Sequence, residues 1–489
     1  MNGIKLRTRV LVATKVRRPG RHIRSGTFLN PGIVTVPLAC AAAVFLVPAD
    51  PSAAGALFWP AWVLTAGILG AVAIDALNLG LNRIFRAEHL VMIAIVIVVY
   101  PELLQGFYST NLEPRLVQTA FLAIGTFATM VAVGSSIKPG RLPAAILDLA
   151  KRQYPTKTVF RILLVCWVLA MFNFAYASSF SLSAMLQGLL ADRWSAPWGR
   201  GQLGGWEAFR DFLTYFGYVV PTFTVVIALR LGSWSRSPVL VGLVCSCIIL
   251  AFIAQSGSRR LIVVIIGSAM LTWLCTKRGQ LKLGHYLIVA CLILVTVVFL
   301  DIMLSQRRLG LEKFSYSRSD FKGLRVDDNF WSLAETLRAI PAEANFVGFH
   351  HLWYVMVRPI PRVFWEGKPV NSGFDLAQHL HAKGVGLANT FIGESYMSFG
   401  WLGIILGGGF VGWLARHWSQ LLEKDYAVIG TALYGLGAMA LFLGIRSMLE
   451  LVLMSYPILC WYALDRFLWK WTHRRSRAQE KLAFARTTR

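Results

Sequence analysis

The feature that most constrains this chain is a succession of apolar stretches that runs through most of its length. A helix that crosses a bilayer needs about 20 mostly apolar residues. Twelve stretches approach or meet that length: 33–48, 57–77, 88–104, 116–134, 158–178, 212–231, 238–255, 261–276, 286–305, 395–415, 427–445 and 447–466. Hydrophobic residues make up 56% of the 489 and charged residues only 15%, which is unfavourable for a soluble chain of this size. We therefore expect an all-α membrane protein with about twelve transmembrane helices.

Basic residues are distributed unevenly among the connections between these stretches. Lysine and arginine collect in short cytoplasmic loops of membrane proteins. If the N-terminus is inside, the inner connections are the basic ones, with Arg83, Arg86, Lys138, Arg141, Lys151, Arg152, Lys157, Arg230, Arg236, Lys277, Arg278, Lys282, Arg416 and Lys424. Both ends of the chain are basic as well, from Lys5 to Arg24 and from Arg466 to Arg489. Both termini are therefore predicted to be cytoplasmic.

This orientation divides the chain into five parts. They are a basic cytoplasmic segment (1–32), transmembrane helices 1–9 (33–305), a large periplasmic loop (306–394), transmembrane helices 10–12 (395–466) and a basic cytoplasmic tail (467–489). The loop is the only polar segment long enough to form a small domain. Within it we expect three helical stretches: 330–340, with Asp327, Asp328 and Asn329 as candidate N-caps and Pro341 as its stop, 350–357, and 374–383 with Gly384 as its C-cap.

Charge and cysteine content exclude several classes of protein. The net charge of +25 would suit a nucleic-acid-binding protein, but the basic residues lie in short patches between apolar stretches rather than on a basic domain. The seven cysteines all lie inside apolar stretches, and the histidines of the long loop match no zinc-binding spacing. We expect no nucleic-acid partner, no disulfide framework, no metal and no cofactor.

Three arginines lie where the distribution of charge gives no reason for them. Arg259, Arg260 and Arg446 occupy tight turns on the predicted outer side, which should be poor in basic residues. Turns this short keep the side chains near the helix ends, at the depth of lipid phosphates. Anion binding is the simplest explanation for their presence.

Two segments of the long loop carry the most informative motifs. Residues 357–373 read VRPIPRVFWEGKPVNSG, in which ten residues separate Arg362 from Gly373. Residues 390–403 read TFIGESYMSFGWLG and lead into the next apolar stretch, and a Gly-Ser-Arg triplet occupies 257–259. In their order and spacing these segments resemble Wzy-type O-antigen and exopolysaccharide repeat-unit polymerases. The earlier outer loop, 179–211, carries no second copy of the arginine and glycine spacing, so a scheme that uses two such loops is in doubt for this chain.

The resemblance implies a fold, a reaction and a location. It implies a GT-C-type bundle in the bacterial inner membrane, with the large helical loop over a cavity at the periplasmic face. It implies a metal-independent glycosyltransferase that moves a growing chain from undecaprenyl diphosphate to the non-reducing sugar of the next lipid-linked unit. The product would be O-antigen, capsule or exopolysaccharide. The partners would be the undecaprenyl-diphosphate-linked oligosaccharide, the bilayer, a chain-length regulator and a flippase.

Such a reaction requires cations for its leaving group. A diphosphate that departs from a partly dry site is stabilised by fixed positive charge, and the planar arginine fork suits phosphate oxygens. Arg358, Arg362 and Lys368 form one candidate group, and Arg259, Arg260 and Arg446 form a second. We expect the guanidinium groups of Arg259 and Arg446 to approach one cavity that Arg362 also faces. The alternative for each residue is a headgroup or carboxylate partner at a helix end.

The acceptor hydroxyl must also lose a proton to a carboxylate or an imidazole. Glu394 is the first candidate, and His379 and His381 are alternatives together with His350 and His351. Glu394 could equally be a helix N-terminal acid that faces the dipole. Trp365 could stack on a sugar ring or anchor the loop.

Two other functions remain open at this point. An O-antigen ligase would share the donor and the fold but transfer glycan to the lipid A core, and the Pro-Arg and Trp-x-x-Lys-Pro segment favours the polymerase. A polytopic transporter or flippase would place ionisable groups near the middle of the membrane, whereas the candidates here lie at helix ends.

Overall fold

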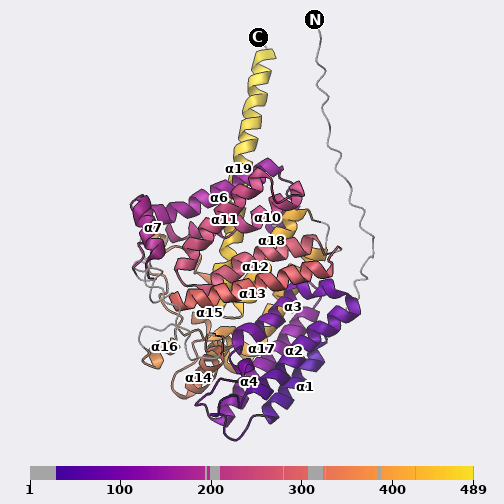
Figure 1. The fold of residues 1–489 in the computed structure, drawn as a ribbon, viewed down its shortest axis with the longest axis vertical. Helices are drawn as coiled ribbons and strands as arrows, with labels where there is room; N and C mark the ends of the chain where they lie inside the picture. The colour runs from indigo at the N-terminus through magenta and orange to yellow at the C-terminus, as the bar shows by residue number, and fades with distance from the viewer. Residues whose placement is uncertain are drawn as a thin grey trace.

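The computed structural model describes residues 29–192, 195–198, 210–278, 280–306, 323–324, 326–382, 387–423 and 426–487. Throughout these ranges the regular structure is helical, without a strand (Figure 1). The basic segment from Lys5 to Arg24, the predicted cap Gly384 and Lys424 lie outside them.

Eight helical segments are long and apolar enough to cross a membrane. They are α2 (Phe58–Leu79), α4 (Pro114–Ser136), α6 (Thr156–Ala177), α9 and α10 (Thr214–Gly217 and Val220–Leu231), α11 (Ser237–Gln255), α12 (Arg259–Thr276), α17 (Thr390–Glu423) and the first part of α19 (Met448–Thr487). Four shorter apolar segments are α1 (Gly32–Phe45), α3 with η2 (Ala87–Ala94 and Ile95–Val99), the middle of α13 (Leu283–Gln306) and α18 (Val428–Gly444). Each of the twelve predicted stretches overlaps one of these helices.

The connections contain shorter helices. These are η1 (Leu81–Phe85), η3 (Leu103–Gln105), α5 (Ala144–Lys151), α7 (Leu182–Leu190) and, in the long loop, α14 (Asn329–Ala342), α15 (Phe349–Met356), η4 (Arg362–Phe364) and α16 (Leu376–His379). The predicted stop at Pro341 is confirmed, because Ile340 already leaves helical geometry. The predicted helix at 374–383 is too long. Asp375 caps the short α16 by accepting bonds from Ala377 N and Gln378 N, and the chain reverses at His381, where φ is +53°.

Close helix packing at the centre of the bundle depends on glycine. A Cβ atom on Gly412 of α17 would lie 2.1 Å from the carbonyl oxygen of Val131 in α4. A Cβ on Gly134 of α4 would lie equally close, at 2.1 Å, to the carbonyl oxygen of Gly409. Small residues allow helix backbones to approach in this way inside membranes. α17 and α4 therefore form a rigid central pair around which the other helices pack.

α17 is not a single straight helix. Its geometry breaks at Phe399 and at Gly400, where φ is +61°. A Cβ on Gly403 would lie 1.9 Å from the carbonyl oxygen of Ser395, although residues eight apart in a straight helix are separated by about 12 Å. The arm 390–398 therefore folds back along the beginning of the arm 401–423. The predicted single crossing at 395–415 is wrong in this respect, because a positive-φ glycine turns the chain over within it.

α14 is also buried inside the bundle, between α4 and α17. Phe330, Leu333 and Ile340 are each fully buried. Its first turn is held by hydrogen bonds to η2 and to the residue before η3: Asn329 Nδ2 donates to Val98 O at 2.6 Å, and Phe330 N donates to Glu102 Oε1 at 2.7 Å. Two parts of the predicted periplasmic loop, α14 and the short arm of α17, thus pack among the apolar helices rather than lying over them.

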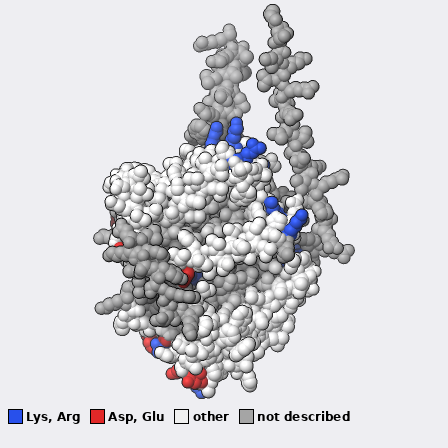
Figure 2. All heavy atoms as spheres, in the orientation of Figure 1, with Lys and Arg blue, Asp and Glu red and all other residues white. Residues whose placement is uncertain are grey.

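The surface charges separate along the molecule. In Figure 2 lysine and arginine gather near the end from which α19 emerges, and aspartate and glutamate gather at the opposite end. The loop helices α14 and α16 lie towards that acidic end in Figure 1.

Candidate functional site

Four segments that are far apart in the sequence meet in one place. They are the α11–α12 turn, the start of α14, the short arm of α17 and the α18–α19 turn. A backbone bond joins two of them, because Phe391 N donates to Ile445 O at 2.9 Å. Positive-φ glycines at 257 and 400 shape two of the chain reversals involved. The side chains at these four places form the candidate site.

Arginines from two of these turns share one carboxylate. Arg259 Nη2 lies 2.9 Å from Asp327 Oδ1, and Arg446 Nε lies 3.4 Å from Asp327 Oδ2. Arg259 begins α12 and Arg446 precedes α19, so the pairing brings together two turns separated by most of the second half of the chain. The two guanidinium groups therefore come together as predicted, whereas the cavity that they would share with Arg362 and their role in anion binding stay predictions.

A second carboxylate completes this arginine cluster, defined here as Arg259, Arg260 and Arg446 with Asp327 and Glu450. Arg260 Nε lies 2.9 Å and Arg446 Nη1 lies 3.6 Å from Glu450 Oε1. Neither Arg260 Nε nor Arg446 Nε makes a hydrogen bond of good geometry, so charge rather than hydrogen bonding holds them. The Arg446 and Glu450 side chains are only 15% and 7% exposed. Charges act more strongly in such partly dry surroundings than in water.

The arginines of the cluster affect the protonation of Asp327. Burial alone would raise the pKa of the Asp327 carboxyl. The positive charges of Arg446, Arg259 and Arg260 outweigh that effect and hold this pKa below its usual range. Asp327 is therefore ionised at neutral pH and serves as an anion that the arginines already bind.

Glu394 lies next to the cluster, on the other side of the α18–α19 turn. Ser447 Oγ donates to Glu394 Oε1 at 2.7 Å, and Met448 N donates to Glu394 Oε2 at 2.5 Å. His351 Nε2 lies 3.4 Å from Glu394 Oε2, and the histidine is 1% exposed. Of the histidines named as alternatives, His351 is thus the one paired with Glu394. The dipole that Glu394 faces belongs to α19 rather than to its own helix.

The other predicted cations form a second group within the loop. Lys368 Nζ donates to Arg358 O at 3.0 Å and to Ile360 O at 2.6 Å, and Arg362 Nη2 donates to Pro369 O at 3.4 Å. Burial, with the charges of Arg358 and Arg362, lowers the pKa of Lys368 to about 8. The Lys368 ammonium thus stabilises the conformation of the loop. The hydrogen bonds of Arg362 are likewise made to backbone oxygens within the same loop.

Arg358, the third member of this second group, also contacts the loop itself. Its guanidinium lies over the Tyr354 ring, 5.8 Å from the ring centre. Among the described residues, no contact of Arg358 or of Arg362 with the arginine cluster is observed.

The remaining predicted residues lie elsewhere on the loop. His379 Nε2 pairs with Glu343 Oε2 at 2.9 Å, and His381 is exposed. Trp365 packs edge-on against Trp353, with ring centres 6.1 Å apart. None of these three has an observed contact with Glu394 or with the arginine cluster. Their predicted roles stay predictions.

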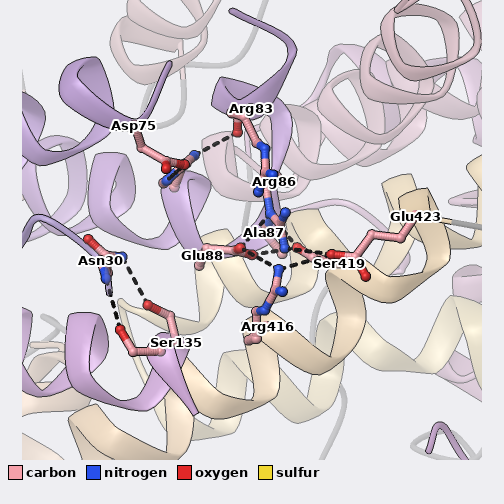
Figure 3. Close-up of polar contacts among 12 residues, drawn as sticks. Asn30, Asp75, Arg83, Arg86, Ala87, Glu88, Ser135, Arg416, Ser419 and Glu423 are labelled. Atoms are coloured by element: carbon pink, nitrogen blue, oxygen red, sulfur yellow. Dashed lines mark hydrogen bonds and ion pairs between the residues drawn. The ribbon is translucent and has the colours of Figure 1, made fainter. Parts of the chain in front are cut away.

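A separate polar cluster occupies the other end of the long arm of α17 (Figure 3). Arg86 Nε lies 2.5 Å from Glu88 Oε1, and Arg86 Nη2 lies 3.0 Å from Glu423 Oε1. Arg416 Nη1 pairs with Glu423 at 3.0 Å, and Ser419 Oγ donates to Glu88 Oε2 at 2.5 Å. Two arginines thus balance two glutamates in a closed network. The charge pattern indicated Arg86 and Arg416, but nothing in the sequence indicated their acidic partners.

The site residues that sequence reasoning missed are the two carboxylates of the arginine cluster. Asp327 appeared only as a helix cap and Glu450 not at all, because a carboxylate in or beside an apolar stretch carries no motif of its own. A signal was available in hindsight. Glu450 lies four residues after Arg446, the spacing of an ion pair on one helix face. Among the described residues no group of three or more histidines, cysteines, aspartates or glutamates could hold a metal ion.

Fold and site together define a helical, multi-pass membrane protein with a charged site where loop helices enter the bundle. Comparison with models of protein families, with curated proteins and with solved structures gives no match.

Proposed function

We propose that this protein is a polymerase that joins undecaprenyl-diphosphate-linked oligosaccharide repeat units at the periplasmic face of a bacterial inner membrane. The observation that carries the proposal is the cluster of three arginines around shared carboxylates, directly beside the Glu394–His351 pair. The arginine cluster is suited to bind a diphosphate, and the Glu394–His351 pair is suited to accept a proton. The reaction needs both at adjacent positions.

The proposed reaction assigns a task to each group. The acceptor hydroxyl oxygen attacks the anomeric carbon of the donor glycan and forms the new glycosidic bond. The bond from that carbon to the phosphate oxygen breaks, and its electron pair leaves with the diphosphate, whose charge Arg446, Arg259 and Arg260 stabilise. The hydroxyl proton passes to the Glu394–His351 pair. Ser447 and Met448 N fix the carboxylate by hydrogen bonds, and the carboxylate lies 3.4 Å from His351 Nε2, where it can stabilise a protonated imidazole.

The proposed topology has twelve spans, with both termini in the cytoplasm. The arginine-rich end in Figure 2 is then the cytoplasmic end, as the positive-inside tendency requires. The Arg86–Glu88–Arg416–Glu423 network lies on that side and the candidate site on the periplasmic side, because the two lie towards opposite ends of the long arm of α17. No metal has a part in this proposal.

Two rival functions are less well supported. A transporter or flippase uses ionisable groups near the middle of its helices, whereas both charged clusters here lie at helix ends. A ligase shares the reaction chemistry and differs in its acceptor. The loop motif that resembles polymerases favours the first function over the ligase.

The glycan profile of a deletion strain distinguishes these functions. A strain that lacks this protein should retain surface glycan one repeat unit long and lose all longer chains, visible as a collapsed ladder on a gel. Restoring the gene should restore the ladder. Loss of the one-unit band as well would contradict the proposal, because a missing ligase or flippase removes every form.

A further inference from the structure

The arginine cluster contains its own anions, and the two carboxylates differ in how firmly they are held. Glu450 lies on α19, is 7% exposed and contacts both Arg260 and Arg446. Asp327 lies in the irregular stretch before α14, and its side chain is 50% exposed. Glu450 is therefore enclosed within the site, whereas half of the Asp327 side chain is accessible from outside it.

Asp327 binds the arginines as a phosphate group would. Its two oxygens contact two different guanidinium groups, Oδ1 with Arg259 and Oδ2 with Arg446. Arginine recognises carboxylates and phosphates through the same fork geometry. A diphosphate offers more oxygens and more negative charge than one carboxylate, so it competes effectively for the same two arginines.

We propose that the Asp327 carboxylate is a displaceable counter-anion that fills the arginine cluster between turnovers, yields to the diphosphate of the lipid-linked substrate and returns when the lipid diphosphate product leaves. This inference rests on the proposed function, because it takes the diphosphate as the incoming anion.

A physical need for such a residue follows from the reaction. Transfer converts a glycosyl diphosphate into a lipid diphosphate with one more ionisable oxygen, so the product binds cations more strongly than the substrate does. An arginine cluster without an internal anion would retain that product. A carboxylate that competes for the same guanidinium groups weakens both complexes and accelerates release.

Equilibrium binding to the purified full-length protein tests the proposal. The probes are farnesyl diphosphate, a short lipid diphosphate, and inorganic pyrophosphate, which has no prenyl chain. Asp327→Asn should bind both probes about tenfold more tightly than the unaltered protein, equivalent to about 1.4 kcal/mol, and should release farnesyl diphosphate more slowly. Asp328→Asn is the matched control, since it removes the same charge one residue away and has no observed contact with the three arginines. It should change neither affinity by more than about twofold, or about 0.4 kcal/mol.

Several outcomes would overturn the inference. Equal or weaker binding by Asp327→Asn would show that the carboxylate organises the arginines rather than competing with the ligand. A gain limited to farnesyl diphosphate would assign the effect to the prenyl chain. Asp327→Ala is the second variant, and failure of both variants to elute as folded protein would show that Asp327 is a structural residue.

A third variant separates this inference from the proposed function. Arg446→Ala should bind both probes at least about tenfold more weakly. If it does so while Asp327→Asn binds like the unaltered protein, the counter-anion proposal is wrong and the anion site stands. If Arg446→Ala binds as tightly as the unaltered protein, the anion site itself is wrong.

Discussion

At the scale of single residues, Glu394 combines an observed structural contact with a proposed catalytic role. Its carboxylate accepts bonds from Ser447 Oγ and Met448 N at the start of α19, which is a structural contact, and it lies 3.4 Å from His351 Nε2. A substitution that keeps the shape of the side chain separates the structural contact from the proposed proton transfer. Glutamine can still accept the bond from Met448 N, but it cannot take up the proton or hold an imidazolium.

Glu394→Gln should therefore lower polymerisation by about 100-fold or more while the protein remains folded, since positioned acid–base groups contribute about 10² to 10⁴ in rate. Chain length on a glycan gel measures the first effect, and the unfolding temperature of the purified protein measures the second. His379→Ala is the control, because His379 pairs with Glu343 on the loop and should leave the ladder intact. A normal ladder in Glu394→Gln, with a collapsed one in His379→Ala or His381→Ala, would contradict this assignment and would show that a loop histidine is the base.

The Lys368 ammonium gives the loop a pH dependence whose sign can be derived. Its pKa is lowered to about 8 in the folded protein, from 10.5. Between those values the unfolded chain binds more protons than the folded one, so the contribution of Lys368 to stability rises with pH. Relative to Lys368→Met, the unaltered protein should gain stability from pH 8 to about 10.5 and show a constant difference below pH 7. Thermal unfolding of both proteins across this range measures the difference, and a difference that falls with rising pH would contradict the assignment.

At the scale of secondary-structure elements, hydropathy predicted the helices well and their paths poorly. The twelve apolar stretches all form helices, because apolar composition over that length leaves the backbone no other means of satisfying its hydrogen bonds in a membrane. The hairpin in α17 was not predicted. The predicted span included residues 395–398 of its short arm, and the reversal depends on a positive φ at Gly400, which glycine allows but which the sequence does not reveal. The burial of α14 was missed for a similar reason, since its polar neighbours marked it as loop.

The hairpin makes Gly403 critical for the site. A Cβ on Gly403 would lie 1.9 Å from the Ser395 carbonyl oxygen, so Gly403→Ala must displace the short arm and Glu394 with it. We expect the variant to lose the ladder and to unfold at a lower temperature, by an amount equivalent to about 1–3 kcal/mol. Gly409→Ala is the matched control on the same helix, because its Cβ would meet only a methionine methyl at 3.9 Å. Similar behaviour of the two variants would contradict the hairpin.

At the scale of the whole molecule, the charge distribution predicted the place of the site better than its members. Arginines on the predicted outer side, which should be poor in basic residues, indicated the α11–α12 and α18–α19 turns. In the structure Arg259 and Arg446 from these turns contact one carboxylate. The loop motif indicated Arg362, which makes only local contacts. The need for a base suggested His379 and His381 as alternatives, and neither has an observed contact with Glu394. Sequence spacing fixes which residues are near in the chain. It does not determine which loop segments enter the bundle. The insertion of α14 and of the short arm of α17 places Asp327 and Glu394 beside the arginines.

The central claim is that the arginine cluster and the Glu394–His351 pair together catalyse the formation of glycosidic bonds between lipid-linked units. The most direct test is reconstitution of the purified protein in liposomes with lipid-linked repeat units extracted from the deletion strain. The unaltered protein should convert single units into a ladder of longer lipid-linked chains without added metal, and Arg446→Ala, inserted at the same level, should leave the single units unchanged. Ladder formation by Arg446→Ala at the rate of the unaltered protein would contradict the account.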